Sequence, residues 1–253
     1  EHVRKCLAEL AVAATFAAFV ALFYNAVLFK GLILGDYDAF VYFYPLREYA
    51  AEIIKQGRFP LWNPYLFLGS PFFANVQTAV LYPLNAIFLI LSTPYAYTAS
   101  IVVHVFLAGV GMYLFCRRTL GVSQLPALIG GVTFMFSGFF SGQVGHINQL
   151  NVSAWLPLLL VTFDEAVRRR SLVIGIAVGL IGSLQLLAGH TQEWYFSSVT
   201  LGFFALWRML SPISPKGKPG KSREIVRRIK PLFYLAIASL VEIGLTAVQL
   251  LPT

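Results

Sequence analysis

Near its amino end the chain reads LAELAVAATFAAFVALFYNAVLF, residues Leu7–Phe29, and Glu9 is the only charged residue in this run. A helix that crosses a bilayer needs about 20 consecutive, mostly apolar residues. The run is longer than the roughly 7–15 apolar residues of a secretory signal peptide, and no small-residue cleavage motif follows it. We therefore predict a membrane-spanning helix that the protein retains.

The rest of the chain repeats this pattern. Six further apolar runs predict additional spans: Tyr95–Phe115, Leu125–Val144, Val152–Val167, Leu172–Ala188, Trp194–Leu210 and Leu232–Leu251. Another run, Ala79–Ser92, is shorter and contains Pro83 and Asn85, which is typical of an interfacial or re-entrant segment. We predict an all-α polytopic membrane protein with about seven transmembrane helices in one domain, residues 1–253. We expect this chain to be the amino-terminal part of a longer protein.

The composition excludes the main soluble alternatives. Of the 253 residues, 58% are hydrophobic and only 12% are charged, whereas a soluble domain carries about 25% charged residues. Two cysteines, Cys6 and Cys116, are too few for a disulfide framework. A soluble enzyme, a disordered tail and a disulfide-stapled secreted module are therefore excluded.

The basic residues predict an orientation. If the amino end is cytoplasmic and seven helices alternate, 15 Lys and Arg residues fall on the cytoplasmic side and four on the other, as the positive-inside rule expects. Residues 211–230 form a predicted basic cytoplasmic loop against anionic lipid. Asp164 and Glu165, close to Arg168–Arg170, predict a solvated ion-pair cluster on the same side. We interpret the net charge of +8 as membrane topology, and expect membrane lipid rather than nucleic acid as a partner.

Residues 30–94 form the first predicted extracytoplasmic loop, which is far longer than a helical hairpin needs. Asp38 is a suitable N-cap for a helix that runs to Gln56, and Gly57 is a suitable stop. The apolar stripe of this helix is Tyr42, Leu46, Tyr49 and Ile53, and the charged residues off the stripe are Arg47, Glu48, Glu52 and Lys55. Such a helix is expected to lie in the membrane interface.

Two acids, Asp36 and Asp38, open this loop, and three roles fit them. They can bind a divalent cation, Mg²⁺ or Mn²⁺, through oxygen ligands. One can act as the general base for an acceptor hydroxyl. Alternatively, they only cap the helix that follows.

Two short outer turns resemble each other in sequence: Gly145-His146-Ile147-Asn148-Gln149 and Gly189-His190-Thr191-Gln192-Glu193. Their polar side chains suit phosphate or sugar hydroxyls, although ordinary turn residues look the same. Zinc binding is a further option, but the spacing is not that of a metal motif. Glu242 lies in the middle of the last run, and it is either a functional intramembrane acid or a partner of a neighbouring helix.

Several motifs together resemble the first outer loop of YfhO-type bacterial membrane proteins. They are Gly35-Asp36-Tyr37-Asp38, Tyr44-Pro45-Leu46, Gly57-Arg58-Phe59-Pro60-Leu61-Trp62-Asn63, Gly69-Ser70-Pro71, Asn75-Val76-Gln77, Leu81-Tyr82-Pro83-Leu84 and the region from Gly138 to Trp155. That family is similar to the GT-C class of membrane glycosyltransferases. The resemblance implies an enzyme that transfers a sugar from a polyprenyl-phosphate donor to an extracytoplasmic acceptor, namely a cell-surface polymer, a lipid or a protein. In that class an acidic motif of the first outer loop is catalytic, and the matching positions here are Asp36 and Asp38.

On this reading Asp36 is the base, and Asp38 is the second carboxylate or a metal ligand. The expected substrate-binding residues are His146, Gln149, His190, Gln192 and Glu193, with Gln77 and Arg58 as further candidates. Two other functions stay open, a transporter or flippase of a lipid-linked saccharide and a non-catalytic membrane assembly protein. We expect the protein in the plasma membrane, with its amino end cytoplasmic and its active face outside; the sequence does not specify the sugar, the acceptor or the oligomeric state.

Overall fold

A computed structural model describes residues 2–210 and 221–251, with side chains described for residues 9–210 and 228–251. The first ten residues of the predicted basic loop 211–230 lie outside these ranges. Its last ten residues begin the final helix. The side chain of Cys6 also lies outside the described residues.

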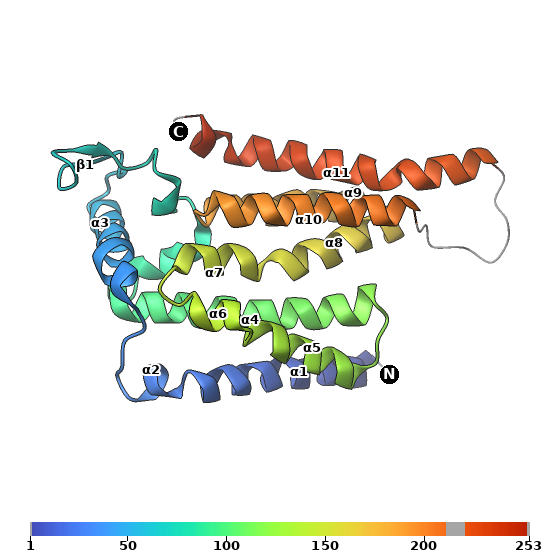
Figure 1. Ribbon diagram of the computed structural model, residues 1–253, viewed down its shortest axis with the longest axis horizontal. Coiled ribbons are helices and arrows are strands. Elements are labelled where there is room, and N and C mark those ends of the chain that lie inside the picture. The colour runs from blue at the N-terminus through green and yellow to red at the C-terminus, as the bar shows by residue number, and fades with distance from the viewer. Residues whose placement is uncertain (1, 211–220, 252–253) are drawn as a thin grey trace.

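The described chain is mostly helical. In order, the elements are α1 (His2–Phe23), α2 (Asn25–Phe29), η1 (Ala39–Phe43), α3 (Tyr44–Lys55), β1 (Trp62–Asn63), β2 (Ser70–Pro71), η2 (Val76–Thr78), η3 (Pro83–Leu89), α4 (Thr93–Leu114), η4 (Phe115–Thr119), α5 (Gln124–Met135), α6 (Gly138–Gly142), α7 (Ile147–Ala154), α8 (Leu156–Arg169), α9 (Leu172–Leu187), α10 (Thr191–Leu210) and α11 (Lys221–Leu250). The long helices lie side by side along one axis and alternate in direction, while α3 lies across one end of the bundle (Figure 1). The two short strands pair antiparallel, with Trp62 opposite Pro71.

Four helical stretches are long and apolar enough to cross a membrane: Thr93–Thr119, Gln124–Gly142, Ile147–Arg169 and Arg228–Leu250. Among the described residues, Glu9–Phe23 and Leu172–Leu187 are shorter apolar helices. These features indicate a mostly helical membrane protein. The apolar run Ala79–Ser92 forms 3-10 turns and no long helix, in agreement with its predicted interfacial or re-entrant character.

Three of the predicted spans are interrupted. The first breaks at Tyr24, between α1 and α2. The second break is at Ser137, whose extended backbone starts α6 anew. Trp155 separates α7 from α8, where Pro157 lies in the first turn of α8. Proline has no N–H to donate, so it fits best in the first turn of a helix. The helix α11 nevertheless continues through Pro231.

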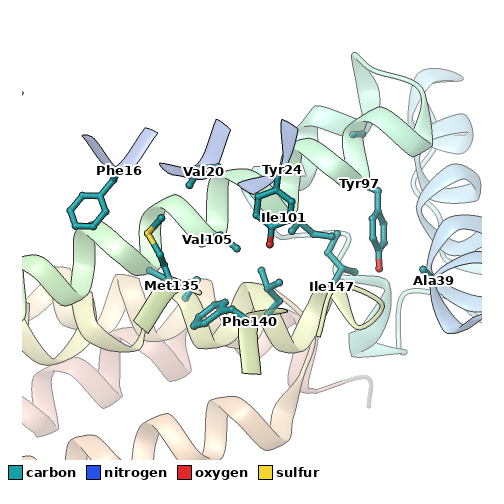
Figure 2. Packing of buried hydrophobic residues seen from close by; sticks show 14 of the residues in the cluster. Phe16, Val20, Tyr24, Ala39, Tyr97, Ile101, Val105, Met135, Phe140 and Ile147 are labelled. Carbon is teal, nitrogen blue, oxygen red and sulfur yellow. The ribbon is translucent and has the colours of Figure 1, made fainter. Parts of the chain in front are cut away.

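The larger of two main cores joins the amino-terminal helices to η1 and α3. This cluster extends along the bundle from Phe16 and Met135, past Phe140 and Ile147, to Tyr97 and Ala39 (Figure 2). The second core lies among α8, α9, α10 and α11. There α9 and α11 approach closely, because a Cβ added to Gly179 would lie only 2.6 Å from the carbonyl oxygen of Ala238.

The two ends of the bundle differ in chemistry. We call the end covered by α3 the α3 end. At the opposite end, η4, α8 and α10 finish in Arg117, Arg118, Arg168, Arg169, Arg170 and Arg208, and we call it the arginine-rich end. There Arg168 Nη1 donates to the carbonyl oxygen of Arg118 at 2.7 Å, which joins α8 to η4.

At the arginine-rich end, the prediction of a solvated ion-pair cluster was wrong for Asp164. Its side chain is only 1% exposed, and it pairs with the buried Arg208 and, at 3.6 Å, with Arg168. The guanidinium of Arg208 also stacks on Trp207, 4.6 Å from the ring centre. The acid is buried because α10, which is remote in sequence, brings Arg208 against α8.

Candidate functional site at the α3 end

The helical segment leading into α3 begins two residues earlier than its sequence suggests. Residues 37 and 38 are already helical, and the side chain of Asp36 accepts a hydrogen bond from the backbone N–H of Ala39 at 3.2 Å. The predicted N-cap, Asp38, caps nothing, so that prediction was wrong. Asp36 is the capping residue, and Asp38 is left free to point elsewhere.

Asp38 meets His146, which lies 108 positions further along the chain. His146 Nε2 lies 2.9 Å from Asp38 Oδ2. The two side chains are 36% and 55% exposed, so solvent and solutes reach this pair. A carboxylate only accepts hydrogen bonds, so when Asp38 is ionised Nε2 of the imidazole is the donor in this contact. His146 Nδ1 is buried and has no partner.

Asp36 lies beside the same Gly-His turn as Asp38, against Gly145. A Cβ added to Gly145 would overlap the Asp36 carboxylate, so only glycine permits this close approach. The turn itself is held by Tyr97 of α4, whose hydroxyl donates to the carbonyl oxygens of Val144 and Gly145, each at 3.0 Å. The structure thus brings the acidic motif and the first Gly-His turn together.

The second Gly-His turn joins this group through Gln149. Gln149 Nε2 lies 3.2 Å from His190 Nε2, and the other ring nitrogen of His190 contacts the Glu193 carboxylate. Burial, and the nearby His146 imidazole, lower the pKa of His190 below its usual value. His190 is therefore neutral near pH 7. Gln192 is exposed at the start of α10.

A buried residue that sequence reasoning did not select, Asn148, forms the floor of the site. Its side-chain oxygen accepts from Arg47, and its Nδ2 donates to the carbonyl oxygens of Gln77 at 2.8 Å and Gly189 at 3.1 Å. One amide therefore ties α3, the segment before η3 and the second Gly-His turn to the first turn.

The sequence pattern groups Arg47 with the charged residues off the apolar stripe of α3, but its side chain is buried. The residue is only 2% exposed, while the expected stripe of Tyr42, Leu46 and Tyr49 does pack against Phe72. Burial lowers the pKa of Arg47 to about 10, so it is still a cation at pH 7. A signal was available, because Phe43, Ala50, Ala51 and Ile54 lie at helical intervals from position 47 and make that face apolar.

Gln77 and Arg58 lie differently from the other expected site residues. Gln77 contributes its backbone carbonyl to the floor, where it accepts from Asn148 and, at 3.3 Å, from Arg47. Arg58 is exposed beyond the carboxyl end of α3 and bonds to Gln56. The structure shows no contact between Arg58 and the two Gly-His turns.

The described residues do not build a metal cluster at Asp36 and Asp38. No group of three or more His, Cys, Asp or Glu side chains within those ranges is arranged to hold a metal ion. A bound Mg²⁺ or Mn²⁺ stays a prediction for the two carboxylates.

Comparisons with known proteins add no further assignment: no protein-family model, curated protein or solved structure matches this chain. The contacts described above define a candidate site of Asp36, Asp38, His146, Gln149, His190 and Glu193. Asn148 and Arg47 form its floor.

Proposed function

We propose that the protein is a membrane glycosyltransferase that moves a sugar from a polyprenyl-phosphate donor to a hydroxyl acceptor at the α3 end. The observation that carries this proposal is the convergence of Asp36, Asp38 and His146 at an accessible surface of an apolar helical bundle. The resemblance of the outer-segment motifs to YfhO-type proteins supports the same reaction class.

The proposed chemistry needs a base and a means to hold the leaving group. The acceptor oxygen attacks the anomeric carbon, the bond between that carbon and the phosphate oxygen breaks, and the polyprenyl phosphate leaves with the bonding electrons. The Asp36 carboxylate takes the proton of the acceptor hydroxyl. His146, held by Asp38, and the polar groups Gln149, Gln192 and Glu193 of the two turns contact the sugar or the phosphate.

The proposal includes a topology. We propose that α1, α4, α5, α8, α9, α10 and α11, with the short helices continuous with them, make seven crossings. The arginine-rich end is then cytoplasmic and the α3 end is outside, as the positive-inside rule favours. A reporter fused after Arg170 should behave as cytoplasmic and one after Asn148 as external; the reverse result would contradict the orientation.

The decisive variant is Asp36→Asn. Asparagine caps helices about as well as aspartate, so this change removes the carboxylate and retains the cap. The protein, purified into proteoliposomes, is incubated with a panel of polyprenyl-phosphate monosaccharides, and release of polyprenyl phosphate is measured. We expect the wild-type protein to release the carrier and Asp36→Asn to lose at least about a hundredfold in rate, the range of a general base.

Two comparisons make this assay specific. Glu48→Gln changes an exposed acid of α3 outside the site and should retain full turnover. If Asp36→Asn also retains wild-type turnover, Asp36 is not the base. Chelation with EDTA, followed by Mg²⁺ or Mn²⁺, tests the predicted divalent cation in the same assay.

A second candidate function, transport of a lipid-linked saccharide, is favoured by one observation. Glu242 of α11 accepts a hydrogen bond from Trp194 Nε1 and lines a cavity of about 200 Å³ among the carboxyl-terminal helices. Intramembrane acids often mark transport pathways. Donor translocation across the vesicle membrane, without release of polyprenyl phosphate and with dependence on Glu242, would favour this alternative.

A further inference from the structure

A cavity of about 270 Å³ lies between α3 and the segment Thr78–Leu89, apart from the accessible surface that carries Asp38 and His146. Its walls are mostly apolar, with Ala50, Ala51 and Ile54 from α3 facing Ala86, Phe88 and Leu89. The segment that closes it, η3, is the one whose sequence is typical of an interfacial or re-entrant element. The cavity therefore suits an apolar chain.

Arg47 is the only charged residue among the described residues that line this cavity. Its guanidinium donates to three uncharged oxygens, those of Thr78, Gln77 and the Asn148 side chain. Its Nε is buried and has no hydrogen-bond partner. No carboxylate within the described ranges forms an ion pair with it.

The described contacts leave the positive charge of Arg47 without a counter-ion. A buried cation is stable when a counter-ion and hydrogen bonds replace its lost hydration. Here the hydrogen bonds are present and the counter-ion is lacking among the described groups. An anion next to Arg47 would supply the missing charge and a partner for Nε.

We propose that this cavity binds a lipid that carries a phosphate headgroup, with the phosphate against Arg47 and the start of the apolar chain along α3 and η3. Guanidinium groups are well suited to phosphate, because their N–H groups match its oxygens in geometry and charge. The apolar walls distinguish a lipid from free phosphate, since each methylene that leaves water strengthens binding about fourfold. The inference does not depend on sugar transfer.

The test uses purified protein in neutral detergent and three probes: dodecyl phosphate, inorganic phosphate and dodecanol. We expect saturable binding of dodecyl phosphate that is at least about tenfold tighter than that of either other probe. Ala86→Trp fills the cavity from an exposed position that makes no contact with the Arg47 hydrogen bonds. This variant should weaken dodecyl phosphate binding by about tenfold or more.

Two further variants complete the test. Leu84→Trp adds the same bulk to the same 3-10 helix at an exposed position that does not line the cavity, and it should bind as the wild-type protein does. Arg47→Gln should reduce the preference for dodecyl phosphate over dodecanol. Equal binding of inorganic phosphate, equal binding of dodecanol, or unchanged binding by Ala86→Trp would each overturn the proposal.

Discussion

The two ends of the bundle use acidic residues in opposite ways. At the arginine-rich end, Asp164 is buried and paired with Arg208 and Arg168, and Glu165 pairs with Arg169. At the α3 end, Asp36 and Asp38 are exposed, and their described partners are a backbone N–H and an imidazole. An acid that is paired with arginines stabilises the fold. An exposed acid without an arginine partner can still form a hydrogen bond or an ion pair with a bound molecule.

The largest effect that this comparison predicts is a loss of stability at the arginine-rich end. Asp164→Ala leaves Arg208 buried without its counter-ion, and removing one partner of a buried pair costs about 3–5 kcal/mol. The free energy of unfolding, measured by denaturant titration in mixed micelles, should fall by that amount. Glu165→Gln, whose partner Arg169 is exposed, should cost under about 1 kcal/mol. An equal loss for Asp38→Asn would remove the distinction between the two ends.

A second prediction concerns the floor of the site. Asn148→Ala removes three hydrogen bonds at once and leaves Arg47 and two carbonyl oxygens with fewer partners. A buried polar group without a partner costs about 1–3 kcal/mol, so unfolding free energy should fall by about 2 kcal/mol. Gln56→Ala, which removes an exposed bond to Arg58, is the control and should have almost no effect. A harmless Asn148→Ala would mean that the two turns are held without this amide.

Most residues that meet at the α3 end could be predicted from the sequence, because the direction of successive helices decides which turns share an end. Helices that alternate in direction return to the same end after every second pass, so turns at positions 145 and 189 had to lie near residues 36–38 if the spans were right. Four spans meet the length and hydropathy of membrane helices, and Figure 1 shows the alternation.

Other features of the site depended on contacts that no local pattern contains. Arg47 is buried because Asn148, 101 positions away, and the carbonyl of Thr78 receive it. Asp36 rather than Asp38 caps the helix, and two acids separated by one residue satisfy the same capping preference. Asp164 looked solvated because its partner Arg208 lies on another helix. In each case a distant segment decided between local alternatives of similar energy.

A third prediction separates activity from stability at the α3 end. Gly145→Ala places a methyl group where the Asp36 carboxylate lies, and the exposed carboxylate must move. Carrier release should fall by about tenfold or more, equivalent to about 1.4 kcal/mol in the barrier. Stability should change by less than that. Gly142→Ala is the matched control, because an added Cβ there meets nothing within 4 Å; equal activity of the two variants would show that the position of Asp36 is unimportant.

The smallest predicted effect is a pH dependence at His190. Burial, and then the His146 imidazole, lower its pKa. Two other groups face the ring: the Glu193 carboxylate, which contacts it, and Gln149, which lies at 3.2 Å and carries no charge. The unfolded chain then binds the proton more readily than the folded one. The contribution of His190 to stability is therefore fully present above about pH 6.5 and is lost as the pH falls through the folded pKa.

An NMR titration of labelled histidine, with His190→Gln to assign the signal, measures this directly. The ring of His190 should remain mostly neutral at a pH where a histidine in a short unfolded peptide is half protonated. In the Glu193→Gln variant its pKa should fall further, because the only carboxylate in contact with it among the described residues is removed. A His190 pKa above the ordinary value of histidine would mean that the Glu193 carboxylate outweighs burial and the His146 imidazole. The second Gly-His turn would then contain an ion pair between His190 and Glu193, like the pairs of the arginine-rich end. Of the acids at the α3 end that form the candidate site, only Asp36 and Asp38 would then remain available to bind a substrate.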